Sequence, residues 1–93
     1  MPYRIRLTRL ARLAVRRLPG NLRQRARRMI DGLANEPRPT NAKELRDEPG
    51  LYRMRLDGWR IIYQVDDETQ GVFVLTIRRK VGPETYKNIE RYT

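Results

Sequence analysis

The chain has 93 residues, of which 21 are Lys or Arg and 11 are Asp or Glu, so its formal net charge is +10. This length predicts one domain over residues 1–93, with room for one modest core. Because cysteine and histidine are absent, disulfides, Cys or His metal sites, thiol nucleophiles and imidazole acids or bases are excluded. No stretch reaches the roughly 18–20 apolar residues that cross a bilayer and the start shows no secretory pattern, so we expect a soluble protein in the cytoplasm.

The positive charge is concentrated near the start of the chain. Residues 1–30 contain ten Arg and no acid, whereas residues 31–93 contain eleven basic and eleven acidic side chains that cancel. A one-sided field of this kind favours a polyanionic partner, which is a nucleic acid, an anionic membrane or an acidic protein. A solvated Arg-rich surface is the alternative.

The chain begins with a strand followed by a helix. Tyr3, Ile5 and Leu7 alternate with polar residues, which predicts a strand with one buried face. Thr8 can then cap a helix over Arg9–Leu18. The apolar stripe of this helix comprises Leu10, Leu13, Ala14 and Leu18.

A second amphipathic helix and a connecting segment come next. Pro19-Gly20 separates the helices, and Asn21 is the expected N-cap of the second, with Gln24 as its capping-box partner. This helix extends to about Asn35, and Glu36 to about Pro49 should connect it to the next strand. Its core-facing positions are Leu22, Ala26, Met29, Ile30 and Leu33. The two helices therefore form an αα-hairpin with a basic outer face.

The second half of the chain predicts three strands. Leu51–Leu56 and Trp59–Asp66 are β-rich runs joined by Asp57-Gly58, a favoured two-residue hairpin turn. Val72–Ile77 is almost continuously apolar, as expected of a central strand that is buried on both faces. Glu84–Tyr92 has helical character, so the element order is β-α-α-β-β-β-α.

The register of the hairpin separates an apolar face from a cationic one. The core face pairs Leu56 with Trp59, Met54 with Ile61 and Tyr52 with Tyr63. The opposite face pairs Arg55 with Arg60 and Arg53 with Ile62. Like charges directly across a ladder destabilise it by up to about 1 kcal/mol, so this face needs an anion. It is a candidate phosphate-binding concavity, for which Arg is well suited; guanidiniums splayed into solvent, or paired with acids, are the alternative.

A second group of cations follows the last strand. Arg78-Arg79-Lys80 ends that strand, and Tyr86 lies six residues beyond Lys80. Strand alternation can place Arg78 and Lys80 on the same face as the hairpin arginines. Cations beside a phenol can bind RNA, by stacking a base on the ring and neutralising phosphates, or cleave it. Alternatively, the cations only solvate the end of the strand and Tyr86 only packs, without a role in RNA binding.

Over nearly its whole length the sequence resembles the RelE-type toxins of bacterial toxin–antitoxin pairs, within the RelE/ParE superfamily. The matching parts are the helical hairpin, Asn41-Ala-Lys-Glu-Leu-Arg, Leu51-Tyr-Arg-Met-Arg-Leu with Trp59-Arg-Ile-Ile-Tyr-Gln-Val, and Arg78-Arg-Lys followed by Glu84-Thr-Tyr86. The Gly-aromatic-Arg-apolar-apolar-Tyr element, Gly58–Tyr63, is quite specific to the superfamily. The resemblance implies an α+β fold, in which a small twisted antiparallel β-sheet packs against the N-terminal helical hairpin and a short C-terminal helix follows.

RelE-type toxins cut messenger RNA in the ribosomal A site without a metal or other cofactor, and the resemblance implies the same activity here. The residues that match the family's catalytic positions are Arg53, Arg55, Arg60, Lys80 and Tyr86. Arg stands at 53 and 55 where the best-known pattern has Lys, and Lys stands at 80 where Arg is frequent. Because a guanidinium is a poor proton acceptor, Lys80 and Tyr86 are the remaining titratable candidates. The reaction would be attack of the RNA 2′-hydroxyl on the adjacent phosphorus.

The remaining expectations concern partners. The side chains expected to bind RNA and the ribosome are Arg9, Arg12, Arg16, Arg17, Arg78 and Arg79. The resemblance implies an acidic, RelB-like antitoxin, and the charge of the chain independently suggests the sign of such a partner. Besides the antitoxin we expect the ribosome and mRNA as partners, and no membrane. Two alternatives stay open: a ParE-type inhibitor of DNA gyrase, which shares the fold, and a non-catalytic nucleic-acid-binding module.

Overall fold

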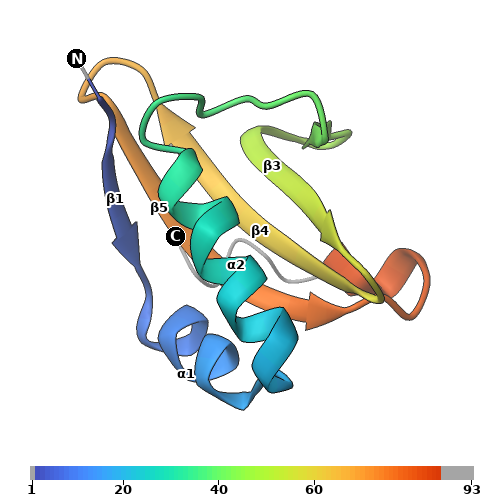
Figure 1. Cartoon of the computed structure of the whole chain (residues 1–93). Helices are drawn as coiled ribbons and strands as arrows, with labels where there is room; N and C mark the ends of the chain where they lie inside the picture. Colours follow the sequence, from blue (N-terminus) through green and yellow to red (C-terminus); the bar gives the residue numbers. More distant parts are fainter. Residues whose placement is uncertain (1, 87–93) are drawn as a thin grey trace.

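A five-stranded sheet forms the centre of the computed structural model, which describes residues 2–86 (Figure 1). Its strands are β1 (Arg4–Leu7), β2 (Ala42–Leu45), β3 (Glu48–Leu56), β4 (Trp59–Asp66) and β5 (Gly71–Arg79), in the spatial order β1-β5-β4-β3-β2. The helices α1 (Arg9–Arg17) and α2 (Gly20–Gly32) lie on one face of the sheet. The α+β class and the order of the elements are therefore confirmed.

The sheet is mixed, whereas the sequence suggested an antiparallel one. Strands β2, β3, β4 and β5 pair antiparallel in succession, but β1 runs parallel to β5. The Thr8 amide, at the end of β1, donates to the Val74 carbonyl at 3.0 Å, and α1 then packs on β5. This crossover sets the direction of β1, and no local pattern in the chain encodes it.

Helix α1 is capped as expected but buries a different stripe. The Thr8 hydroxyl accepts a hydrogen bond from the Ala11 amide at 3.0 Å. The buried positions are Ala11, Val15 and Leu18, whereas Leu10 is 49% exposed. The predicted stripe of Leu10, Leu13, Ala14 and Leu18 is thus wrong in part. Helical spacing allowed both stripes, and contact with β5 selects the one centred on the small Ala11.

Helix α2 starts one residue before the predicted N-cap. Pro19 occupies the N-cap position and no side chain caps the helix, so the capping box of Asn21 and Gln24 is wrong. The φ of Pro19, −51°, lies in the range that the proline ring fixes, and the helix begins directly after it at Gly20. The predicted apolar stripe is confirmed, because Leu22, Ala26, Ile30 and Leu33 are buried and Met29 packs against them.

The segment predicted as a connection contains an additional strand. Ala42–Leu45 forms β2, which pairs with β3, and β3 itself begins at Glu48. The register shifts between Glu44 and Leu45. This edge strand has little apolar alternation of its own, since only Leu45 is fully buried, and its pairing with β3 decides its conformation.

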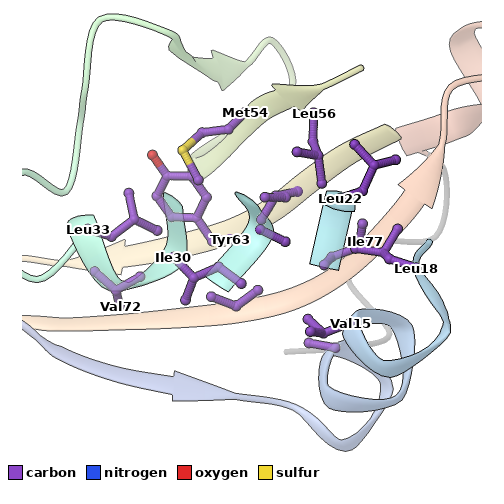
Figure 2. Packing of buried hydrophobic residues seen from close by; sticks show 14 of the residues in the cluster. Val15, Leu18, Leu22, Ile30, Leu33, Met54, Leu56, Tyr63, Val72 and Ile77 are labelled. Atoms are coloured by element: carbon purple, nitrogen blue, oxygen red, sulfur yellow. The ribbon is translucent and has the colours of Figure 1, made fainter. Parts of the chain in front are cut away.

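Two hydrophobic clusters lie on the two faces of the sheet. The larger one fills the space between sheet and helices, where Tyr63 and Met54 approach Leu33 and Ile30 (Figure 2). The smaller one, on the other face, comprises Leu45, Leu51, Ile62 and Leu75, with Tyr86 packed against it. Strand β5 contributes to both clusters, which confirms its prediction as a central strand buried on both faces except at Phe73, which is exposed.

The end of the chain is described only as far as Tyr86. A short 3-10 helix, η1, spans Pro83–Tyr86. Most of the helix predicted over Glu84–Tyr92 lies outside the described residues. No helix among residues 2–86 has the length and apolar character needed to span a membrane.

Candidate active site

The hairpin register places the predicted arginines on the sheet face opposite the helices, here called the basic face. Arg55 pairs with Arg60, Arg53 pairs with Ile62, and Arg60 pairs on its other side with Arg78. All the hairpin pairs predicted from the sequence are confirmed. Strand alternation therefore brings arginines from three neighbouring strands together.

Tyr86 lies over the middle of this face between two cations. The Arg53 guanidinium carbon and the Lys80 amino nitrogen are each 5.6 Å from the centroid of its ring. Both distances fall within the roughly 6 Å range of a cation–π interaction. The Tyr86 hydroxyl is buried and has no hydrogen-bond partner among residues 2–86.

The chain returns to the basic face through contacts that centre on Thr85, a residue the sequence did not single out. Thr85 is 2% exposed, its hydroxyl accepts from the Val81 amide at 2.9 Å, and its carbonyl accepts from the Arg78 guanidinium at 2.8 Å. Gly82 turns the chain with a φ of 125°, which favours glycine. Arg78, expected to contact RNA, thus also positions the segment that carries Tyr86.

Arg60 is held beside the hairpin turn. Its Nη1 donates to the carbonyls of Asp57 at 2.9 Å and Trp59 at 2.8 Å, while its Nε is buried without a partner in residues 2–86. Arg55, directly opposite, is exposed. The two carbonyls orient the guanidinium of Arg60 and leave donors available to an anion.

No carboxylate neutralises the hairpin arginines within residues 2–86. The ion pairs of this part of the chain are Arg25 with Asp57, at 3.1 Å, and Arg38 with Asp67, at 2.8 Å. Asp57, the acid nearest to the hairpin arginines in sequence, is engaged by α2. The alternative in which neighbouring acids neutralise Arg53, Arg55 and Arg60 therefore does not hold for the described residues.

Lys43 is a further cation on the basic face that sequence reasoning missed. It is the cross-strand partner of Arg53 on the exposed edge strand β2. The signal was present in the chain, since Lys43 belongs to the segment Asn41 to Arg46 that carries the family resemblance. Its face could not be assigned because β2 itself was not predicted.

The other predicted RNA-binding residues are not gathered at this site. Arg79 points to the opposite side from Arg78 and lies over the Trp59 ring, with its guanidinium carbon 5.8 Å from the centroid. Arg12, on α1, donates to the Leu7 carbonyl at 2.9 Å. The four α1 arginines, Arg9, Arg12, Arg16 and Arg17, are exposed on the helical side of the molecule.

A second polar network, at the other end of the sheet, binds the segment that follows α2 to the strands and to the turn after β4. Arg38 binds both carboxylate oxygens of Asp67, at 3.1 and 2.8 Å, and the Tyr52 hydroxyl at 2.8 Å. Tyr3 donates to the same carboxylate at 2.6 Å. The hydrogen bonds from Arg38, and then from Tyr3, lower the pKa of Asp67. Because its charges are mutually satisfied, we assign this network a structural role.

Comparisons with known proteins agree with the fold. A family model described as the ParE toxin of the type II toxin–antitoxin system parDE matches residues 5–81. The mRNA interferase toxin RelE of Escherichia coli strain K12 is 32% identical over 73 residues, which make up 76% of each chain. The chain is a RelE-type toxin of the RelE/ParE superfamily.

Solved structures of other RelE proteins have the same architecture as this RelE-type toxin. A free E. coli RelE variant with two arginines changed to alanine superposes with a TM-score of 0.78 at 28% identity, covering 98% of this chain and 97% of that one. The Mycobacterium tuberculosis RelBE2 toxin–antitoxin complex matches with a TM-score of 0.73 at 31% identity, over 85% and 99% of the respective chains. The archaeal RelE–RelB complex of Pyrococcus horikoshii OT3 has a TM-score of 0.77 at 27% identity, over 86% and 97%.

Proposed function

We propose that this toxin is a ribosome-dependent mRNA interferase that cleaves mRNA in the A site without a metal. The observation that carries the proposal is the placement of Arg53 and Lys80 against the Tyr86 ring, on the face that also holds Arg60, with no carboxylate among residues 2–86 to neutralise these cations. The relatives named as mRNA interferases support it. Such an activity would operate in the cytoplasm, where translation takes place.

The cationic cluster suits a reaction that builds up negative charge. In the proposed step the 2′-hydroxyl oxygen bonds to the adjacent phosphorus and the bond from phosphorus to the 5′-oxygen breaks. The products are a 2′,3′-cyclic phosphate and a 5′-hydroxyl, so one proton leaves the 2′-oxygen and one reaches the 5′-oxygen. The preorganised guanidinium of Arg60 stabilises the charge on the phosphorus oxygens, while the ribosome orients the mRNA.

Proton transfer falls to Lys80 and Tyr86, because Arg53 and Arg55 carry guanidiniums that accept no proton. The Tyr86 hydroxyl is buried in this structure, so its participation requires η1 to shift when mRNA binds. Tyr86→Phe should then lower the cleavage rate while leaving the thermal unfolding temperature unchanged or higher, since it removes an unsatisfied buried hydroxyl. Full activity of a folded Tyr86→Phe protein would assign the proton transfer elsewhere.

The decisive experiment compares mRNA on translating ribosomes with free RNA. Purified toxin is added to a defined cell-free translation reaction and the RNA ends are mapped by primer extension. We expect cuts within ribosome-bound mRNA and almost none in naked RNA. Arg53→Ala should abolish most cutting, and Arg28→Ala, an equal change of charge at an exposed position of α2, should not. Equal cleavage of free and bound RNA would refute ribosome dependence.

Inhibition of DNA gyrase is the second candidate function. The family model that matches residues 5–81 carries the ParE name, although the relative and the solved structures described above are RelE proteins. A supercoiling assay with purified gyrase separates the two activities. Gyrase inhibition without any RNA cut would move this toxin to the ParE class.

We further propose that an acidic, RelB-like antitoxin holds this toxin inactive. The net charge of +10 favours such a partner, and the RelE proteins of Mycobacterium tuberculosis and Pyrococcus horikoshii form complexes with their antitoxins. We favour displacement of η1 or exclusion from the A site over direct plugging, because η1 is a single turn of four residues and such a short element opens at lower cost than a strand of the sheet. Co-expression with the neighbouring open reading frame should relieve growth arrest; persistent toxicity beside its folded product would contradict this mechanism.

A further inference from the structure

A hollow of about 680 Å³ lies on the basic face, at the end of the sheet away from the hairpin turn. This volume is within the roughly 300–1,000 Å³ of typical ligand sites. Its wall includes Arg4 and Arg6 of β1, Gly71 and Phe73 of β5, and Gln64 and Asp66 of β4. None of these belongs to the catalytic set proposed above.

The register explains why the sheet is hollowed at this point. Arg6, Phe73 and Gln64 are cross-strand neighbours in one row, and Arg4, Gly71 and Asp66 form the next row outward. Gly71 carries no side chain between Arg4 and Asp66, and the Thr69 hydroxyl lies 3.3 Å from the place that a β-carbon of residue 71 would occupy. Phe73 is 36% exposed, although its neighbours Val72 and Val74 are buried.

The cations of the hollow have no partner in the described chain. Within residues 2–86 neither Arg4 nor Arg6 forms an ion pair or a side-chain hydrogen bond, and both are exposed. The one acid at the rim, Asp66, uses its Oδ1 to accept from the amides of Glu68 and Thr69, at 3.0 and 3.4 Å. An aromatic ring beside two unpaired guanidiniums therefore remains on the surface.

We propose that this hollow is a second RNA subsite, in which an unpaired base of the mRNA stacks on Phe73 while Arg4 and Arg6 bind its flanking phosphates. The inference deepens the proposed function and rests on it, because the occupant is taken to be the same strand that is cut at the Arg53 and Tyr86 site. Base stacking on an aromatic side chain beside basic groups is the general mode by which proteins hold single-stranded nucleic acid.

Continuity along the sheet favours RNA over a protein partner. The row of Phe73 and Gln64 and the row of Ile62 and Arg53 are two residues apart along β4, which is roughly 7 Å at about 3.3 Å per residue. Phe73 and Tyr86 thus lie on the same face, with cations beside both rings. A strand bound at Tyr86 can continue directly onto Phe73.

The test measures binding of a fluorescent single-stranded RNA oligonucleotide whose 2′-hydroxyls are methylated, which removes the nucleophile. Phe73→Leu, which keeps an apolar side chain but removes the ring, should weaken binding at least about fivefold, the lower end for one stacked base. Arg4→Gln with Arg6→Gln should lower the slope of log affinity against log salt by up to about 1.4, at about 0.7 per phosphate on a single strand. The control pair Arg27→Gln with Arg28→Gln, on the helical side, should change binding far less.

The outcomes separate this inference from the proposed function. Loss of affinity in the hollow variants, with unchanged thermal unfolding, supports the subsite even if no ribosome-dependent cut is found. If the wild type cleaves mRNA on ribosomes but Phe73→Leu binds the oligonucleotide as tightly as the wild type, the subsite is overturned and the nuclease proposal is unaffected. Absence of wild-type binding also overturns it. So does normal RNA binding with weaker capture of the co-expressed antitoxin, which would make the hollow a protein-docking surface.

Discussion

Arg60→Ala tests whether one side chain both supports the hairpin and stabilises the transition state. Its Nη1 binds the carbonyls of Asp57 and Trp59, and losing these charge-assisted bonds costs about 1–2 kcal/mol, since one of them is exposed to solvent. Removing the repulsion between Arg60 and Arg55 should raise the free energy of unfolding by a few tenths to about 1 kcal/mol. The expected net loss of about 1 kcal/mol lowers Tm by about 4–8 °C for a domain of this size.

The same substitution should reduce cleavage on ribosomes by about 10²-fold or more, the usual effect of losing one preorganised donor. Thermal unfolding and single-turnover primer extension are measured on the same preparations. Arg55→Ala is the matched control for stability, because it relieves the same repulsion but removes no described hydrogen bond, so its Tm should stay the same or rise. A folded Arg60→Ala protein with full activity would refute the catalytic role, and an unchanged Tm would refute the role of the two carbonyls.

Three further predictions concern pH and salt. Tyr63→Phe removes a buried donor to a backbone carbonyl and should lower the free energy of unfolding by about 1–2 kcal/mol in urea titrations. Burial raises the pKa of Tyr63, so the neutral hydroxyl stabilises the fold below about pH 10, and this stabilisation is lost above that pH. If Tyr63→Phe and the wild type lose stability equally at alkaline pH, this reasoning is wrong. Arg38 lowers the pKa of Asp67, so the ionised carboxylate stabilises the fold above about pH 4, and this stabilisation fades as the pH falls. Asp67→Asn should therefore reduce the dependence of the free energy of unfolding on acid pH. Identical acid dependence in the variant and the wild type would disprove this. Replacing Arg12 and Arg16 with Gln should flatten the salt dependence of ribosome affinity between about 50 and 200 mM, and a wild-type affinity that ignores salt would remove the basis for the effect.

Local patterns in the sequence were sufficient to predict the element that carries most of the site. The alternation of Leu51–Leu56 and Trp59–Asp66 around Asp57-Gly58 specifies both the pairing and the face of every hairpin residue, because side chains on a strand alternate with a period of two. The opposition of Arg55 and Arg60 follows from that register alone. The apolar stripe of α2 was predictable for the same kind of reason, since helical periodicity is a local property.

Features that depend on contacts between distant segments were decided only by the tertiary structure. The parallel direction of β1 is set by its pairing with β5, far away in the chain, although its alternation predicted a strand. Strand β2 has little alternation of its own, and its pairing with β3 decides its conformation. The buried stripe of α1 was ambiguous until β5 selected Ala11 over Leu10. Tyr86 meets Arg53 because the chain turns back after β5, where Thr85 is bound by Arg78 and Val81. The hollow at Phe73 lies where residues of three strands meet. Periodicity specifies which face a residue occupies, but the neighbours on that face are set by packing between segments that the sequence keeps apart.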